Sequence, residues 1–248
     1  PDALRIGQEG RGFIAMMERL VPERVGAAVN NTAHASQILD ETIEYVKGRK
    51  AFGRPVGSFQ HNKFKVAELK TKMDVTQAFV DQCVAAHAAA ALRVERAKVL
   101  QHRPDTDDLL VRAGVGWDPG VVGRAALPAG AASPPGRALR TCAAVVLEDL
   151  RAAEGFERSG LLRRHGVVSL LDVPVRLPGG AVWGVLEADA EAPRRFRREH
   201  RHFLLSLAGL LGAAIRRLEV EAALRDSEAL KGAILEAALD CVVTIDQD

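Results

Sequence analysis

Cysteine and histidine are the residue types that most often build metal and redox sites, so their spacing is considered first. The three cysteines lie far apart, at Cys83, Cys142 and Cys241. They form no Cys-x-x-Cys pair and have no histidine at ligand spacing, so neither a zinc site nor a disulfide framework is predicted. His200 and His202 lie two residues apart in a helical stretch and would not face one another, so we expect no metal there.

Three glycines near the start of the chain have the appearance of a phosphate-binding loop. Gly7, Gly10 and Gly12 precede a helical stretch, and glycine loops at helix starts can bind phosphate. No strand pattern comes before them, however, and no Lys-Ser or Lys-Thr pair follows. We therefore interpret residues 1–12 as a turn-rich loop before a helix.

Length and composition are those of a globular protein. The 248 residues predict about two domains, and the hydrophobic fraction of 48% and charged fraction of 27% are ordinary. A net charge of +2 gives no reason to expect a nucleic acid or a membrane as a partner. No apolar run is long enough to span a bilayer and no leader is apparent, so we expect a cytoplasmic protein. Because the chain begins with Pro1, we expect a fragment or a processed product.

The use of lysine changes along the chain. Lysine is frequent up to Lys98, and after that only Lys231 occurs, with arginine taking its place. Two coding backgrounds joined near residues 64–92 would give this pattern, and so would an ordinary difference between two domains of one gene. Both interpretations stay open at this point.

The central element is a helix that we predict over residues 64–92. No Gly or Pro interrupts it, it ends in an alanine run, and apolar residues recur at helical spacing, at Val66, Leu69, Met73, Val80 and Cys83. Before it, we expect helices over residues 13–20 and 22–48, with Pro22 in the first turn of the second. The face that this second helix is expected to bury carries Ala28, Ile38, Thr42 and Tyr45.

After the central helix the chain changes to short strands and turns. We expect strands over residues 95–101, 108–115, 143–147, 167–176 and 181–189, a short helix over 156–165, and a long helix from Phe196. Leu-Pro-Gly-Gly predicts a hairpin at residues 177–180, and Ser-Pro-Pro-Gly predicts a turn at residues 133–136. The predicted fold class is therefore α+β, with a helical segment followed by an antiparallel sheet, flanking helices and a long C-terminal helix.

The first third of the chain carries GQEGRGF, then Glu23-Arg24, then YVKGRKAFGRPVGSFQHNKFKVAELKTKMD. These motifs resemble the C-terminal helical domain of the acyl-CoA dehydrogenases over residues 1–90. The resemblance implies a helical bundle in which Arg49 and Gln60 reach the FAD of a neighbouring subunit, and Phe52 packs near the flavin nucleotide. A guanidinium and an amide are suited to binding a pyrophosphate. The resemblance also places Arg24 near the acyl chain of the substrate, while an ordinary surface charge is the alternative.

The parts of that family that carry its chemistry are not matched. The catalytic carboxylate of the family follows the last matching residue, and the domains that hold most of the flavin would precede Pro1. Because removal of a substrate α-proton needs a positioned carboxylate, no catalytic residue is nominated. We expect this chain to have no dehydrogenase activity and to bind FAD weakly.

The second half carries LLVRAGVGW, VVLEDL, RRHGVVSLLDVPVRLPGGAVWGVLEAD and FRREHRHFLLSLAGLLGAAI. Their order and spacing resemble a GAF domain over residues 91–219, a fold that can bind cyclic nucleotides, tetrapyrroles or small metabolites. Cys142 could suggest a bilin-linking thiol, but TCAAVV lacks aromatic and histidine neighbours, so we assign it no such role. A GAF domain has a helix before its first strand, and only residues 64–92 can supply it. We expect Val80, Cys83 and Val84 to pack on the sheet.

Residues 220–248 resemble a linker helix and the opening of a PAS domain. We interpret the chain as a GAF-type sensing and dimerisation module of a bacterial signal-transduction protein that carries a catalytically incomplete dehydrogenase segment. One alternative is a fragment of an FAD-dependent acyl-CoA dehydrogenase, and another is an artefactual or designed fusion without evolved function. Two apolar stripes predict that the helix of residues 196–230 forms a homodimer. A small-molecule GAF ligand is expected, but the sequence does not identify it.

Overall fold

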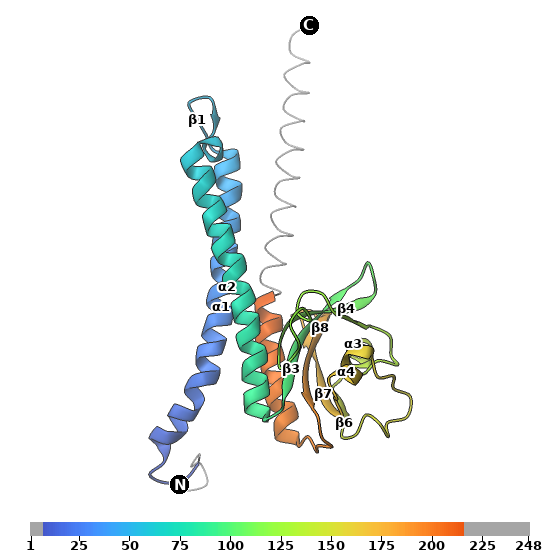
Figure 1. The fold of residues 1–248 in the computed structure, drawn as a ribbon. Helices are drawn as coiled ribbons and strands as arrows, with labels where there is room; N and C mark the ends of the chain where they lie inside the picture. Colours follow the sequence, from blue (N-terminus) through green and yellow to red (C-terminus); the bar gives the residue numbers. More distant parts are fainter. Residues whose placement is uncertain (1–6, 216–248) are drawn as a thin grey trace.

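The structure is a computed structural model that describes residues 7–215, while residues 1–6 and 216–248 lie outside the description. Figure 1 shows a long helical hairpin and, beside one end of it, a curled sheet. The PAS-like stretch and the distal part of the predicted dimerisation helix fall outside the described residues.

Two long helices and a small tip form the hairpin. Its elements are α1 (Gly12–Gly48), the short strands β1 (Lys50–Ala51) and β2 (Arg54–Pro55), the 3-10 turn η2 (Val56–Ser58) and α2 (Gln60–Leu92). The two strands pair antiparallel at the tip, and the two helices lie side by side (Figure 1). α2 confirms the central helix that the sequence predicts, and it begins four residues earlier.

α1 is one continuous helix, so the predicted break between residues 20 and 22 is wrong. Pro22 removes a single backbone hydrogen bond from a helix of 37 residues, and it lies where the first turns are exposed, so the freed carbonyl can reach water. The predicted buried face is also wrong, since all four of its residues are exposed, Ile38 at 61% and Tyr45 at 64%. The buried residues are instead Gly26, Val29, Thr32, Ala33 and Leu39.

A six-stranded antiparallel sheet forms the second part, in the order β5-β4-β3-β8-β7-β6. Its strands are β3 (Arg96–Arg103), β4 (Asp108–Val115), β5 (Ala126–Pro128), β6 (Val145–Leu147), β7 (Ser169–Arg176) and β8 (Val182–Ala190). The five predicted strands and the hairpin at residues 177–180 are confirmed, and the predicted α+β class holds. The short edge strand β5 was not predicted.

Two short helices cover the face of the sheet that points away from the hairpin, which we call the outer face (Figure 1). They are α3 (Pro134–Thr141) and α4 (Gly160–Arg164), and α4 lies within the predicted helix of residues 156–165. α3 occupies a stretch whose first residues were predicted as a turn. Ser133 is its N-cap and proline follows at the first helical position, where the missing N–H costs no helical hydrogen bond.

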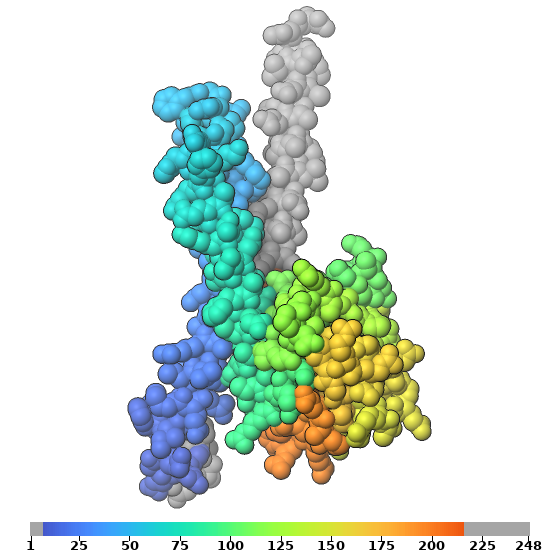
Figure 2. Space-filling model, viewed as in Figure 1, coloured from blue at the N-terminus to red at the C-terminus, as the bar shows by residue number. Residues whose placement is uncertain are grey.

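Three helical segments lie on the inner side of the sheet. The second half of α2 and a helix of residues 198–215 lie against the sheet, and α1 packs on the side of α2 that faces away from it (Figures 1 and 2). The apolar core that they share contains Val29 and Ala33 of α1, Val80, Val84, Ala88 and Leu92 of α2, Val99 and Leu186 of the sheet, and Leu204 and Leu211 of the last helix. Val80 and Val84 therefore face the sheet as predicted, while Cys83 is partly exposed.

The helix of residues 198–215 has apolar cover on two sides within one chain. Leu204, Leu207 and Leu211 are buried in the shared core. On its other side the helix lies close to α1 at Gly26. A Cβ atom added to Gly26 would be 3.7 Å from Cδ1 of Leu210, a side chain that is 41% exposed. α1 therefore supplies part of the cover that the sequence pattern assigns to a second chain.

Replacing Val80 by aspartate tests whether α2 supports the sheet. Val80 is 5% exposed, so Val80→Asp buries an unpaired carboxylate, and we expect unfolding to become easier by about 3 kcal/mol or more. Urea denaturation measures this loss, and limited proteolysis should show new cleavage beyond Leu100. Val75→Asp is the matched control, because Val75 belongs to the same helix and is 65% exposed. Equal resistance of the two variants to protease would show that the sheet is independent of α2.

Candidate functional site

The tip of the hairpin brings together three of the four residues that the dehydrogenase resemblance singles out. Arg49, Phe52 and Gln60 are all exposed there, Phe52 at 97% and with a positive φ of 53° in the turn between β1 and β2. Arg24 is exposed on α1 and lies apart from them. At 1.5 Å per residue, it is about 36 Å from the end of that helix at Gly48.

The residues at the tip fit only a small part of the nucleotide that the family resemblance implies. A cavity of about 290 Å³ lies beside it, but its lining includes Ile43, Val46 and Val66 and none of the three exposed residues. An exposed guanidinium and an amide are suited to the pyrophosphate of FAD. They do not enclose a flavin ring, so the residues present fit only part of that cofactor, and no reaction step follows from them.

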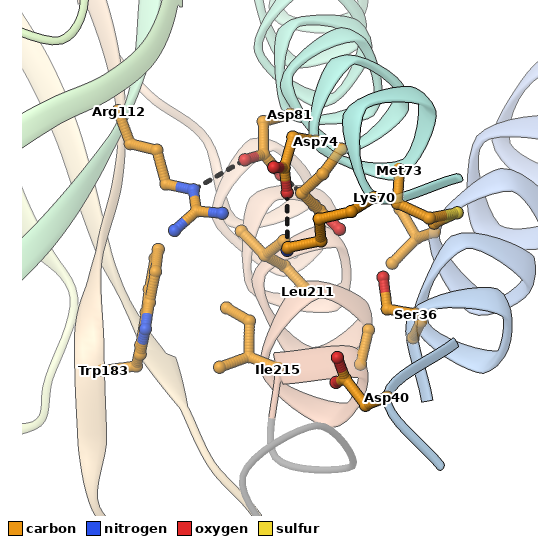
Figure 3. Close-up of a pocket in the computed structure, with 14 residues that line it drawn as sticks. Ser36, Asp40, Lys70, Met73, Asp74, Asp81, Arg112, Trp183, Leu211 and Ile215 are labelled. Atoms are coloured by element: carbon orange, nitrogen blue, oxygen red, sulfur yellow. Dashed lines mark hydrogen bonds and ion pairs between the residues drawn. The ribbon is translucent and has the colours of Figure 1, made fainter. Parts of the chain in front are cut away.

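A half-buried ion pair connects the hairpin to the sheet. Asp81 of α2 is 3% exposed, and it accepts hydrogen bonds from Nε of Arg112 on β4 at 2.7 Å and from Nε2 of Gln77 at 2.8 Å (Figure 3). The guanidinium carbon of Arg112 also lies 5.5 Å from the ring centroid of Trp183. A cavity of about 340 Å³ opens beside this pair, between α1, α2 and the sheet. The pair links α2 to β4, and because Asp81 is buried, removing Arg112 would leave that carboxylate without its ion-pair partner.

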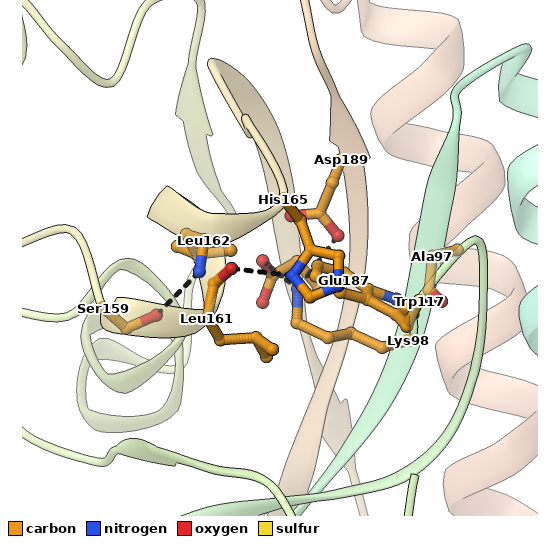
Figure 4. Close-up of polar contacts among 9 residues, drawn as sticks. All are labelled: Ala97, Lys98, Trp117, Ser159, Leu161, Leu162, His165, Glu187 and Asp189. Carbon is orange, nitrogen blue, oxygen red and sulfur yellow. Dashed lines mark hydrogen bonds and ion pairs between the residues drawn. The ribbon is translucent and has the colours of Figure 1, made fainter. Parts of the chain in front are cut away.

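Charged residues cross the centre of the outer face of the sheet. Lys98 of β3 lies directly opposite Glu187 of β8, Glu187 lies opposite Asp172 of β7, and Asp189 follows on the same face. All four residues are fully buried. Nζ of Lys98 donates to Oε1 of Glu187 at 2.5 Å and to Oδ2 of Asp189 at 2.9 Å (Figure 4). We call these four residues the acidic row.

The acidic row has more acceptors than its single ammonium group can satisfy. Both carboxylate oxygens of Asp172, Oε2 of Glu187 and Oδ1 of Asp189 have no hydrogen-bond partner among the described residues. Burial raises the pKa of all three carboxyl groups, those of Asp172 and Asp189 well above the usual range. Burial also lowers the pKa of Lys98, but attraction to Asp189 and Glu187 outweighs it and raises that pKa. Glu187 and Asp189 therefore stabilise the positive charge of Lys98, while burial favours the neutral, protonated forms of the acids.

Trp117 covers the ammonium group of Lys98. The Nζ atom lies 4.2 Å from the indole ring centroid, which is cation–π geometry, and the indole N–H donates to the carbonyl of Ala97 at 3.1 Å. Gly114, opposite Lys98 on β4, makes this possible, since a Cβ there would come within 2.9 Å of the indole. The ring of His165 packs edge-on against Trp117 with centroids 4.9 Å apart.

An open cavity of about 640 Å³ lies between the loops beyond His165. One ring nitrogen of His165 is 3.2 Å from a carboxylate oxygen of Asp118, and the other is 3.0 Å from the carbonyl of Leu161. Asp118 and Leu161 line the cavity, so His165 lies between it and the Trp117 cover. Arg124 and Arg164 also line it, and two guanidinium groups favour an anionic ligand.

The remaining sequence candidates lie in ordinary surroundings. Cys142 ends α3 with a φ of 52°, and its sulfur is 3.8 Å from the carbonyl of Leu139. Within residues 7–215, no group of three or more His, Cys, Asp or Glu side chains is arranged to hold a metal ion. In the same part of the chain, no helix combines the length and hydropathy of a membrane span.

Sequence reasoning did not identify the acidic row. In LEADA the acidic residues alternate with apolar ones, a pattern typical of a strand with one solvated face, and SLLDVPV carries one acid within an apolar run. The structure covers that face with α3, α4 and their loops, which buries the charges. A useful signal was the presence of three acids and one lysine at alternating positions in central strands.

Comparison with known families agrees with this two-part architecture. The profile of the GAF domain matches residues 79–215, more than half of the chain, and that of the acyl-CoA dehydrogenase C-terminal domain matches residues 10–102. The chain therefore belongs to the GAF domain family, and its N-terminal part is similar to the C-terminal domain of the acyl-CoA dehydrogenases. Because the two profiles overlap over residues 79–102, the boundary between residues 90 and 91 stays a prediction.

The curated relatives match the dehydrogenase segment. Long-chain specific acyl-CoA dehydrogenase of Sus scrofa is 36% identical over 124 residues, which cover 47% of this chain and 29% of that enzyme. A 3-(aryl)acrylate reductase of Clostridium sporogenes is 36% identical over 75 residues, covering 30% of this chain and 20% of the relative. The chain thus spans less than a third of these relatives' lengths.

The solved structures that resemble this one are GAF domains. The GAF domain of a phosphoenolpyruvate-protein phosphotransferase from Coxiella burnetii superimposes with a TM-score of 0.54, at 16% identity, over 78% of this chain and 99% of that structure. The corresponding domain from Acinetobacter gives a TM-score of 0.50 at 22% identity, over 58% of this chain and 84% of that structure. These identities show the fold alone.

Titration with FAD tests the role of the tip. A few exposed hydrogen bonds, each worth about 0.5–1.5 kcal/mol net, cannot offset the entropy of fixing a large cofactor. We expect calorimetry to detect no tight site, Arg49→Ala to behave like the unaltered chain, and acyl-CoA-dependent dye reduction to stay at the level of a heat-inactivated control. Micromolar affinity that Arg49→Ala abolishes, or turnover above that control, would contradict this prediction.

Proposed function

We propose that this chain is a sensing and dimerisation module of a bacterial signal-transduction protein, in which the dehydrogenase-type hairpin serves as a helical connector. The observation that carries the proposal is the continuity of α2. Its first half pairs with α1 near the tip, and its second half is part of the core of the GAF sheet. A change of position on the sheet is therefore passed along one uninterrupted helix, a known means of signal transmission.

Membership of the GAF domain family supports a sensing role, because the family resemblance implies a fold that can bind small molecules. Neither alternative, a dehydrogenase fragment or a fusion without evolved function, draws comparable support from the fold, because the GAF core includes residues of the dehydrogenase segment. The cytoplasmic location, the PAS domain and the origin of the join stay predictions.

The loop cavity is the place where we propose that a small anionic ligand binds. A thermal-shift series with cyclic AMP, cyclic GMP and small carboxylic acids should find a stabilising ligand whose effect is lost in Arg164→Ala.

Amide exchange should then change in α1 and α2 as well as in the sheet. Arg112→Met removes the partner of Asp81 and should weaken this transmission without preventing binding. Arg54→Ala, at the remote tip, is the control and should preserve both effects. Binding that leaves exchange in the hairpin unchanged would contradict the connector role.

A homodimer is proposed through the last helix and the adjoining face of α1. Leu210 is 41% exposed, and the first turns of α1 expose further large apolar side chains, Phe13, Ile14, Met16, Met17 and Val21. Exposed apolar patches of this kind commonly mark interfaces.

Sedimentation equilibrium tests this dimer. We expect the unaltered chain to be dimeric and Leu210→Glu to be a folded monomer, because the substitution places a charge on the exposed edge of the helix. Leu211→Glu is a different case, since Leu211 is 3% exposed and its replacement should unfold the core. Ser206→Glu, on an exposed position of the same helix that carries no apolar side chain, is the control. An unaltered chain that stays monomeric at high concentration would remove the proposal.

A further inference from the structure

Lys98 has surroundings that resemble those of a bound ligand rather than those of an ordinary core residue. Its ammonium group is held by carboxylates of two residues, at 2.5 Å and 2.9 Å, and lies under an indole ring at 4.2 Å. Carboxylate acceptors combined with an aromatic face are the chemistry by which proteins recognise organic ammonium ions. The backbone leaves room for this arrangement through Gly114, where any Cβ would collide with Trp117.

The acidic row contains more hydrogen-bond acceptors than the two that Lys98 uses in its salt bridges. Asp172 is fully buried and lies opposite Glu187 on the same face, and among the described residues its oxygens have no donor other than a carboxyl proton shared with Glu187. One oxygen of Glu187 and one of Asp189 are also unpartnered within residues 7–215. Since buried polar atoms are nearly always paired in folded proteins, these oxygens need either a proton shared between neighbouring carboxyl groups or the N–H donors of an ammonium group.

We propose that the acidic row is a binding site for a primary ammonium group, and that the side chain of Lys98 occupies it as an internal ligand. The three carboxylates provide the acceptors, Trp117 provides the aromatic face, and the four-carbon stem of Lys98 fills the space of an alkyl chain. A free amine can enter only by displacing Lys98. This assignment goes beyond the signalling proposal and does not depend on it, since it concerns only the outer face of the sheet.

Chemical rescue tests the site. Lys98→Ala removes three methylene groups and the ammonium group, and these are the atoms of the n-propylammonium ion. In the full chain we expect Lys98→Ala to lower Tm, and n-propylammonium chloride to restore it in a saturable way. The unaltered chain should show no such shift, because Lys98 fills the site. 1-Propanol lacks the charge and tetramethylammonium lacks the N–H donors, so neither should rescue the variant.

Two further variants separate the site from general stability effects. In the background of Lys98→Ala, Asp189→Asn should weaken the apparent affinity for n-propylammonium at least tenfold, because it replaces the oxygen acceptor pair that lies 2.9 Å from the ammonium nitrogen of Lys98 in the unaltered chain. Lys72→Ala is the matched control, since Lys72 is exposed and pairs with Glu68 on the surface of α2. Its Tm should not respond to the amine. Equal rescue by 1-propanol, or no rescue of a folded Lys98→Ala, would overturn the proposal.

A measurement on the unaltered chain covers the case in which Lys98→Ala does not fold. Reductive methylation followed by peptide mass mapping should modify Lys72 and leave Lys98 unmodified, because its ammonium group is enclosed and bound. The yield of refolded Lys98→Ala, with and without n-propylammonium, then replaces Tm as the measure of rescue. Methylation of Lys98 as fast as Lys72, or a refolding yield that the amine does not raise, would show that no enclosed ammonium site exists.

Discussion

The packing of the second half of α2 is the contact on which the rest of the structure depends. This stretch lies between α1 and the sheet, so it must present small or apolar residues in two directions. Ala85, Ala88 and Ala89 allow close approach, and Val84 is fully buried. Its one buried acid, Asp81, is satisfied by Arg112 and Gln77. The overlap of the two family profiles over residues 79–102 has a physical basis, because the same helix belongs to both cores.

The sheet places two kinds of interior on its two faces. Because side chains alternate along a strand, Leu186 and Ala188 meet the helices while Glu187 and Asp189 point to the other face. One interior is apolar and is held together by the packing of side chains. The other holds buried charge, where removing one partner leaves an uncompensated ion. The strands are thus fixed in register twice, by packing on one face and by ion pairing on the other.

Local periodicity made much of the fold predictable, and tertiary contacts decided the rest. α2 and the five main strands follow from the spacing of apolar residues, and the Arg49 to Gln60 motif identified the residues at the tip. The continuity of α1 through Pro22 could not be predicted, because that residue is also typical of a helix start. The face that α1 buries depends on where α2 and the last helix lie. The acidic row was missed because only the cover formed by α3, α4 and their loops makes it an interior.

The length of α2 beyond the sheet has a mechanical consequence. From Val80 to the first residue of the helix, Gln60, the arm measures about 30 Å at 1.5 Å per residue. A tilt of about 10° at the sheet would therefore displace the tip by about 5 Å, close to one turn of a helix. In the signalling role proposed above, the hairpin would act as a lever that turns near the Asp81–Arg112 pair, and a small rearrangement at the sheet would become a larger movement at the tip.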